Sequence, residues 1–129
     1  MVPLINAVIA HIKAETTPFA PFKVGMLDTA SKGIAIRMIP SSPGSRFMNR
    51  SRIKAVQFQI IGKSPDQMEV MAAMDAFEDL LELSNGELNV PGYDFILCEA
   101  SNNTAYVEKT SANEYIYSTF YRAELSKRG

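Results

Sequence analysis

The sequence is poor in the residues that build disulfide frameworks and metal sites. Its 129 residues include one cysteine, Cys98, one histidine, His11, and no tryptophan. A lone cysteine excludes an intrachain disulfide, and one cysteine with one histidine leaves no ligand set for zinc. The chain also has no run of 18 apolar residues and no signal-peptide pattern at its start. We therefore expect no bound metal, no secretion signal and no contact with a membrane.

Apolar residues make up 47% of the chain and charged residues 21%, a balance typical of globular proteins and not of disordered ones. At this length we expect one domain over residues 1–129, large enough to bury a core without disulfides.

The net charge of −1 conceals a division along the chain. Residues 1–63 hold nine basic and two acidic side chains, a net charge of +7, whereas residues 64–129 hold four basic and twelve acidic ones, a net charge of −8. One interpretation is a mixed surface that happens to be sorted along the sequence. The other is a pair of oppositely charged faces, which suits head-to-tail contact between identical copies and closure into a ring.

The N-terminal part predicts a helix, two strands and a loop. Apolar residues recur at helical spacing over residues 2–15, which predicts an amphipathic helix. Two short apolar runs, 22–27 and 33–39, flank a turn of small residues and predict a β-hairpin. The prolines, serines and glycine that follow predict a protruding loop at about 40–52.

The middle of the chain predicts a strand over 51–62 followed by a helix over 65–83. Ser64 is the expected helix cap, and Gln67 completes a capping-box pattern. An apolar stripe that includes Phe77 is expected to face the core. The opposite, solvated side is expected to be acidic, with Glu69, Asp75, Glu78, Asp79 and Glu82.

Three further strands are predicted over 93–100, 104–110 and 114–126, the first two joined by a turn at residues 101–103. The predicted element order is therefore α-β-β-β-α-β-β-β. This order favours an α+β fold with a mostly antiparallel sheet and two helices packed side by side on one face.

Candidates for catalysis are weak. His11 is expected at the polar margin of the first helix, and Cys98 lies in the apolar run FILCEA, where a buried, inert thiol is expected. The spacing of the acidic helix residues suits an exposed face as well as a pair of catalytic carboxylates. The sequence contains no phosphate-binding glycine loop, zinc motif or nucleophile elbow. We expect a protein that is not an enzyme and has no cofactor.

The most unusual stretch is residues 46–54, called here the basic arm. It places apolar side chains among cations; its candidate contact residues are Arg46, Phe47, Met48, Arg50, Arg52 and Lys54. One interpretation is a solvated loop. The other is a contact arm, which either inserts into an acidic neighbour or faces a channel filled with DNA.

Three segments carry a resemblance to a known family. They are the strand and capped helix VQFQIIGKSPDQMEVMAAMDAFEDLLEL, the segment PFKVGMLDTASKGIAIRMIPSSPGS before them, and the closing aromatic strand YIYSTFYRAEL. In these features the chain resembles the phage minor capsid proteins and the tail terminator, or tail completion, proteins of long-tailed phages. The resemblance covers nearly the whole chain at the level of pattern.

The resemblance implies a structural protein of the virion, made in the host cytoplasm and placed at the interface between head and tail. Members of this family form hexameric rings that cap the tail tube, end its growth and present a surface to the head connector. The implied partners are thus further copies of this chain, the tail tube protein and head connector proteins, with DNA passing through the ring. The family has no catalytic motif whose residues could be carried over.

Two other classes of function remain open on the residues alone. A small α+β enzyme or ligand-binding domain lacks convergent site residues in the sequence. A non-catalytic module that contacts nucleic acid or a ligand through the basic arm lacks the overall basic charge of such domains.

Overall fold

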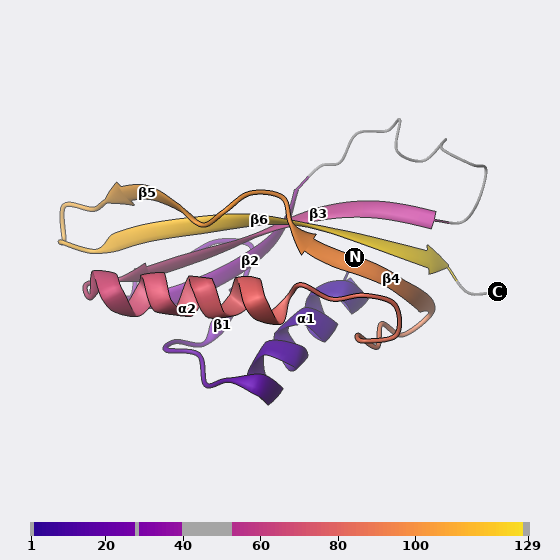
Figure 1. Ribbon diagram of the computed structural model, residues 1–129. Helices are drawn as coiled ribbons and strands as arrows, with labels where there is room; N and C mark the ends of the chain where they lie inside the picture. Colours follow the sequence, from indigo (N-terminus) through magenta and orange to yellow (C-terminus); the bar gives the residue numbers. More distant parts are fainter. Residues whose placement is uncertain (1, 28, 40–52, 128–129) are drawn as a thin grey trace.

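A computed structural model describes residues 2–27, 29–39 and 53–127. These residues form two helices and six strands, with the helices together on one face of the sheet (Figure 1). In chain order the elements are α1 (Val2–Glu15), β1 (Phe22–Val24), β2 (Gly33–Ile39), β3 (Ile53–Ser64), α2 (Gln67–Leu80), β4 (Tyr93–Ala100), β5 (Ala105–Lys109) and β6 (Tyr115–Lys127). The predicted α+β class, with a mostly antiparallel sheet, is confirmed.

The sheet is built on the long antiparallel pair β3 and β6, which stay in register from Ile53↔Ser126 to Ser64↔Tyr115. β2 pairs antiparallel with the free side of β3, and β1 lies outside β2. On the far side of β6 lie β4 and β5. The expected loop at about 40–52 lies outside the described residues.

The predicted hairpin between the first two strands is wrong, because β1 runs parallel to β2. Phe22 is paired with Ile34 and Val24 with Ile36, so both strands point the same way. β1 is only three residues long. Residues 25–32 are therefore enough for the chain to return to the level at which β1 began, since an extended chain spans about 3.3–3.6 Å per residue. A period-two apolar pattern indicates a strand but not its direction, so the pattern could not show whether these two strands are parallel or antiparallel.

The predicted turn between the next pair of strands is also wrong. β4 and β5 do not pair with each other; they lie in line along the same side of β6. The segment between them continues the ladder, because Ser101 N–H donates to the Phe120 carbonyl (2.7 Å) and Asn102 Oδ1 accepts from Phe120 N–H (2.9 Å). The chain reverses after β5 instead, where Thr110 N–H donates to the Glu114 carbonyl at 2.8 Å.

The second helix is shorter than predicted, and its cap is a different residue. The N-cap is Asp66, whose Oδ1 accepts from the backbone N–H groups of Met68 (3.1 Å) and Glu69 (3.2 Å). Ser64 instead ends β3 and is fully buried. Its Oγ accepts from Asp66 N–H and donates to Glu69 Oε1, so it supports the first turn without capping it. At the other end, Leu81 closes the helix, two residues before the predicted end at residue 83.

The core lies between the helices and the sheet. The apolar stripes of α1 and α2 meet the inward-facing residues of β2, β3 and β6; among the fully buried side chains are Leu4, Val8, Ile12, Ile34, Ile36, Phe58, Ile60, Val70, Met74, Phe77, Tyr121 and Leu125. α2 lies close over β3 at Gly62, where an added Cβ would be 2.9 Å from Val70 Cγ2 and 3.2 Å from Met74 Sδ. The two helices also touch, as expected, since His11 Nε2 lies 3.1 Å from the Leu80 carbonyl oxygen.

Candidate functional site

The basic arm lies almost wholly outside the described residues. Arg46, Phe47, Met48, Arg50 and Arg52 are among the residues left undescribed, so their role in a contact stays a prediction. Lys54 is the exception: it is the second residue of β3 and is exposed. Its ammonium nitrogen lies 5.7 Å from the centre of the Tyr93 ring at the start of β4, within the range of a cation–π contact.

The two side chains considered for nucleophilic or acid–base chemistry, His11 and Cys98, lie in packed surroundings within the fold. His11 is half-buried and links α1 to the end of α2 through the Leu80 carbonyl. Cys98 is buried in β4, and burial together with the nearby Glu99 carboxylate raises the pKa of its thiol to about 12. A thiol with so high a pKa is almost entirely protonated at neutral pH and is a poor nucleophile. In the ranges 2–27, 29–39 and 53–127, no group of histidine, cysteine and carboxylate side chains is arranged to hold a metal ion.

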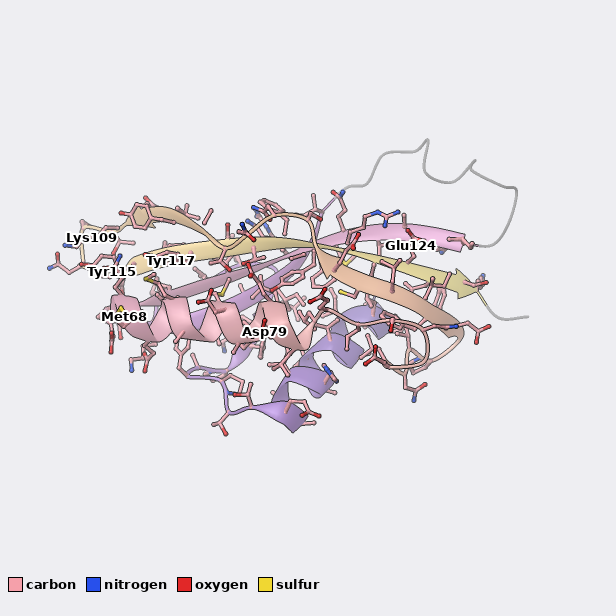
Figure 2. All side chains as sticks on the ribbon, in the orientation of Figure 1. Met68, Asp79, Lys109, Tyr115, Tyr117 and Glu124 are labelled. Atoms are coloured by element: carbon pink, nitrogen blue, oxygen red, sulfur yellow. The ribbon has the colours of Figure 1, made fainter. Side chains whose placement is uncertain are left out.

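The acidic side of α2 divides into solvated and bound carboxylates. Asp75, Asp79 and Glu82 are exposed as predicted; Asp79 is labelled in Figure 2. Glu78 is half-buried and holds the segment between β4 and β5, because its Oε1 accepts from both the N–H (2.6 Å) and the hydroxyl (2.8 Å) of Thr104. The Glu78 carboxylate therefore has a structural role and is not part of the solvated face that the sequence predicted.

Glu69 differs from the predicted solvated carboxylates in a similar way. Its Oε1 lies 2.9 Å from the ammonium of Lys32, and the Ser64 hydroxyl donates to the same oxygen. These two hydrogen bonds, Lys32 first, lower the pKa of the Glu69 carboxyl. The interaction ties the chain before β2 to the first turn of α2, and Glu69 is thereby a structural residue.

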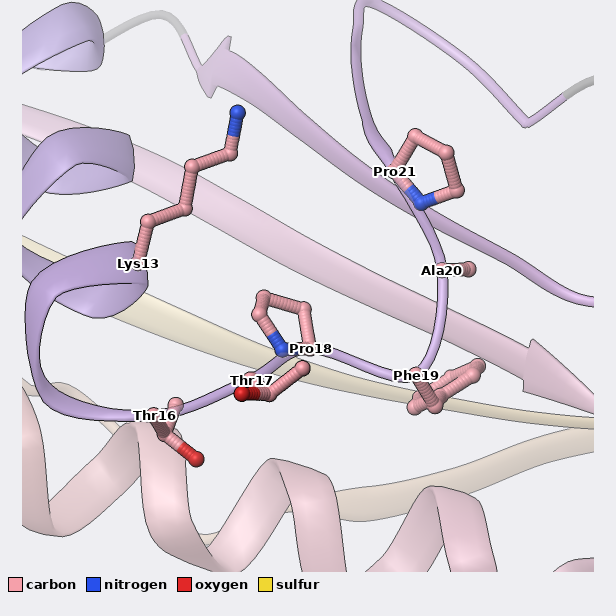
Figure 3. A pocket seen from close by; sticks show the side chains of 7 residues that line it. All are labelled: Lys13, Thr16, Thr17, Pro18, Phe19, Ala20 and Pro21. Carbon is pink, nitrogen blue, oxygen red and sulfur yellow. The ribbon is translucent and has the colours of Figure 1, made fainter.

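An open depression of about 420 Å³ lies where the chain leaves α1 (Figure 3). It is lined by Lys13, Thr16, Thr17, Pro18, Phe19, Ala20 and Pro21. A second hollow, of about 440 Å³, begins on the other side of the same linker and is lined by it and by α2. Lys13 is the single charged residue lining the first hollow and Glu69 the single one lining the second, so neither offers a paired acid and base.

The sheet face away from the helices carries polar groups that pair with one another. Arg37 Nε on β2 donates to Gln59 Oε1 on β3 at 2.7 Å, and Arg122 on β6 forms an ion pair with Glu124. At the far end of the sheet, the hairpin of β5 and β6 holds an aromatic group (Figure 2). There Tyr117 accepts a hydrogen bond from Gln67 and meets the edge of the Tyr106 ring.

The two outer edges of the sheet differ in how they are covered. Along β4, residue Leu83 adds a bridge to Cys98, with backbone hydrogen bonds of 2.9 Å in both directions. The five residues of β5 are all exposed, and within the described residues their backbone groups form hydrogen bonds to β6 alone. β1 is likewise the last strand on its side. Sequence patterns could not locate these edges, because edge position depends on long-range pairing.

No protein-family model matches the chain, and no curated protein sequence matches it. A solved structure is similar in fold: a protein chain of the virion of a native gene transfer agent (GTA) particle. The two chains share 15% sequence identity and superpose with a TM-score of 0.67. The similarity covers 94% of this chain and 92% of the virion chain. At this identity the comparison establishes a common fold.

Proposed function

We propose that this protein is a structural component of a phage-like virion, of the tail terminator type. In this proposal its copies form a hexameric ring that caps the tail tube, joins it to the head connector and lets DNA pass through its centre. The observation that carries the proposal is the common fold, over 94% of the chain, with a protein from a GTA virion. The finer assignment, to tail terminators, comes from the resemblance of the strand and capped helix at residues 56–83 to that family.

The proposal includes the absence of enzymatic activity. It is supported by the structural roles of the two candidate nucleophilic or acid–base residues: His11 holds two helices together, and Cys98 is buried with a raised pKa. The hollows beside the α1–β1 linker lack paired titratable groups. In a ring protein the working parts are surfaces that recognise neighbours, and these need no such site.

We infer that the basic arm of one copy contacts the acidic side of α2 on the next. The exposed carboxylates Asp75 and Asp79 are four residues apart, which places them on one side of α2, and exposed Glu82 lies two residues beyond the end of the helix at Leu80. The arm offers three arginines, whose planar guanidinium groups can hold a carboxylate through two hydrogen bonds. Such a contact joins different surfaces on the two copies, as ring closure requires.

The test compares wild-type protein with a variant in which Arg46, Arg50 and Arg52 are changed to Ala. Mass in solution and negative-stain electron microscopy report ring formation, alone and with tubes assembled from the tail tube protein of the same particle. We expect the variant to fold normally and to lose rings or attachment to tubes at low salt. The difference from wild type should shrink as salt is raised, because salt screens the ion pairs that only the wild type can form. A control removes exposed cations elsewhere, with Lys13 and Lys127 changed to Ala, and should keep both.

Three outcomes separate the alternatives. If rings and attachment persist in the arginine variant while DNA retention in particles falls, the arm faces DNA. If nothing changes, the arm is a solvated loop and the inferred contact is wrong. If wild-type protein forms no ring and binds no tube, the proposed function itself is wrong.

A further inference from the structure

The backbone of β1 turns hydrogen-bonding groups away from its own sheet. Val24 is paired with Ile36 in the parallel ladder, and Gly25 N–H donates to the Ile36 carbonyl at 2.9 Å. In a parallel pair, a residue bonds to the two neighbours of its partner and not to the partner itself. Here Ile36 bonds to the neighbours of Val24, so the N–H and C=O of Val24 point outward. The side chain of Val24 is 65% exposed. Such an edge is a template for pairing with another strand.

The edge at β5, like that at β1, has outward backbone groups and exposed apolar side chains. Its outward backbone groups are unbonded in the described part of the chain, and its Tyr106 and Val107 side chains are 53% and 52% exposed. A register shift between Tyr106 and Glu108 leaves Val107 as a bulge. Bulges disrupt regular pairing, so the part of this edge suited to a new strand is its beginning, around Ala105 and Tyr106. That length is comparable to the three residues of β1.

The two open edges lie at the same level of the sheet. The ladder can be followed across it from strand to strand: Phe22 pairs with Ile34, which pairs with Gly62, which pairs with Tyr117, which pairs with Tyr106. Phe22 and Tyr106 are thus on one row, at opposite ends. A second copy placed beside the first in the same orientation therefore brings its β1 level with the first copy's β5.

The direction and the facing of the strands also agree. β1 and β2 are parallel, and each of the next three neighbours along that row reverses direction, so β5 runs opposite to β1. Phe22 packs against Phe77 of α2, and Tyr106 packs against Tyr117, which is bonded to α2 through Gln67. Because alternate residues share a face, exposed Val24 is on the helix side as well. Pairing the edges would join apolar side chains on the same face.

We propose that neighbouring copies pair edge to edge, β1 of one copy against β5 of the next, in an antiparallel manner that continues the sheet around the ring. The occupant of each edge is a second copy of this chain. Copies in a ring repeat one orientation, so β1 of one copy meets β5 of the next, whereas β1–β1 or β5–β5 pairing would need a two-fold relation between the copies. The inference rests on the proposed function, and it specifies which elements build the ring.

Crosslinking tests the contact directly. In a Cys98→Ala background, one protein carries Val24→Cys and a second carries Tyr106→Cys. We expect a short bis-maleimide crosslinker to join the two when they are mixed, and to produce ladders up to the closed ring when one chain carries both changes. The matched control is Asn85→Cys with Val24→Cys, since Asn85 is exposed and lies between α2 and β4, beside the end of the sheet where Tyr93 pairs with Lys127. It should give no ladder.

A second variant removes one of the proposed hydrogen bonds between copies and leaves the side chains of the core unchanged. Val24→Pro deletes the outward N–H, and the extended residue before it suits a proline. We expect it to lower the ring fraction at least tenfold at a concentration where half of the wild-type protein is in rings. Asn85→Ala, a change at an exposed site away from both edges, should leave the ring fraction unchanged. The urea midpoint of each variant shows that the subunit itself is folded.

The results separate this inference from the proposed function. Rings of wild-type protein that show no crosslink between residues 24 and 106, or crosslinks only between identical positions, overturn edge pairing and leave the ring itself standing. Rings that persist at full yield in Val24→Pro do the same. Wild-type protein that forms neither rings nor complexes with tail tubes overturns both.

Discussion

Replacing Phe77 with Ala should remove a large part of the stability of this protein. Phe77 is 1% exposed and joins α2 to β1, because its ring lies 5.8 Å from that of Phe22. Truncating a buried phenylalanine to alanine costs about 3–5 kcal/mol, from lost transfer free energy and from the cavity left behind. Whole domains have about 5–15 kcal/mol of stability, so the loss is a substantial part of the total and would bring a domain at the low end of that range close to unfolding.

Urea denaturation followed by circular dichroism measures this free energy, with the slope showing whether unfolding remains two-state. Met71→Ala is the matched control on the same helix, because Met71 is 37% exposed and alanine is the better helix former. Its stability should change by less than about 0.5 kcal/mol. A double-mutant cycle with Phe22→Ala should give a coupling of about 0.5–1.5 kcal/mol for the ring pair. A Phe77→Ala loss under about 1 kcal/mol would mean that α2 does not pack as described.

Three further variants or measurements test other parts of the structure. Gly62→Ala should destabilise the fold by about 1–3 kcal/mol, because its methyl group meets Val70 and Met74; unchanged urea stability would contradict that close approach. Asp66→Ala should cost about 1 kcal/mol through loss of the helix cap, and a neutral result would return the cap to Ser64. Cys98, with its pKa raised to about 12, should react with a thiol reagent only after unfolding; rapid modification of native protein would show that it is accessible.

Local patterns were sufficient to predict most of the elements. The stripe of α1 and the apolar side of α2 were evident from spacing, since a helix places residues three and four apart on one face. The alternation of residues in 114–126 indicated the strand that became β6. Prolines and glycines placed the interruptions between elements. Each of these signals lies within a few residues, and for that reason the sequence alone can carry it.

The helix cap was missed through competition between neighbours. Ser64 and Asp66 are both good capping residues, and Ser64 has Pro65 and Gln67 in the positions of a capping box. The pairing of Ser64 with Tyr115 keeps that serine in β3, so the helix begins two residues later, behind Asp66. A strand partner 51 positions away in the sequence thus decided a local choice.

The sequence by itself determined which segments are helices and strands, which faces are apolar, and that the charges divide along the chain. The tertiary structure alone decided that β1 runs parallel to β2, that β4 and β5 share one side of β6, and that Phe22 and Tyr106 end the same row. Strand direction and order depend on hydrogen bonds between residues far apart in the chain, and the same period-two pattern suits any of several arrangements. Only the packed sheet selects one of these arrangements, and that selection also determines which edges remain open to a neighbour.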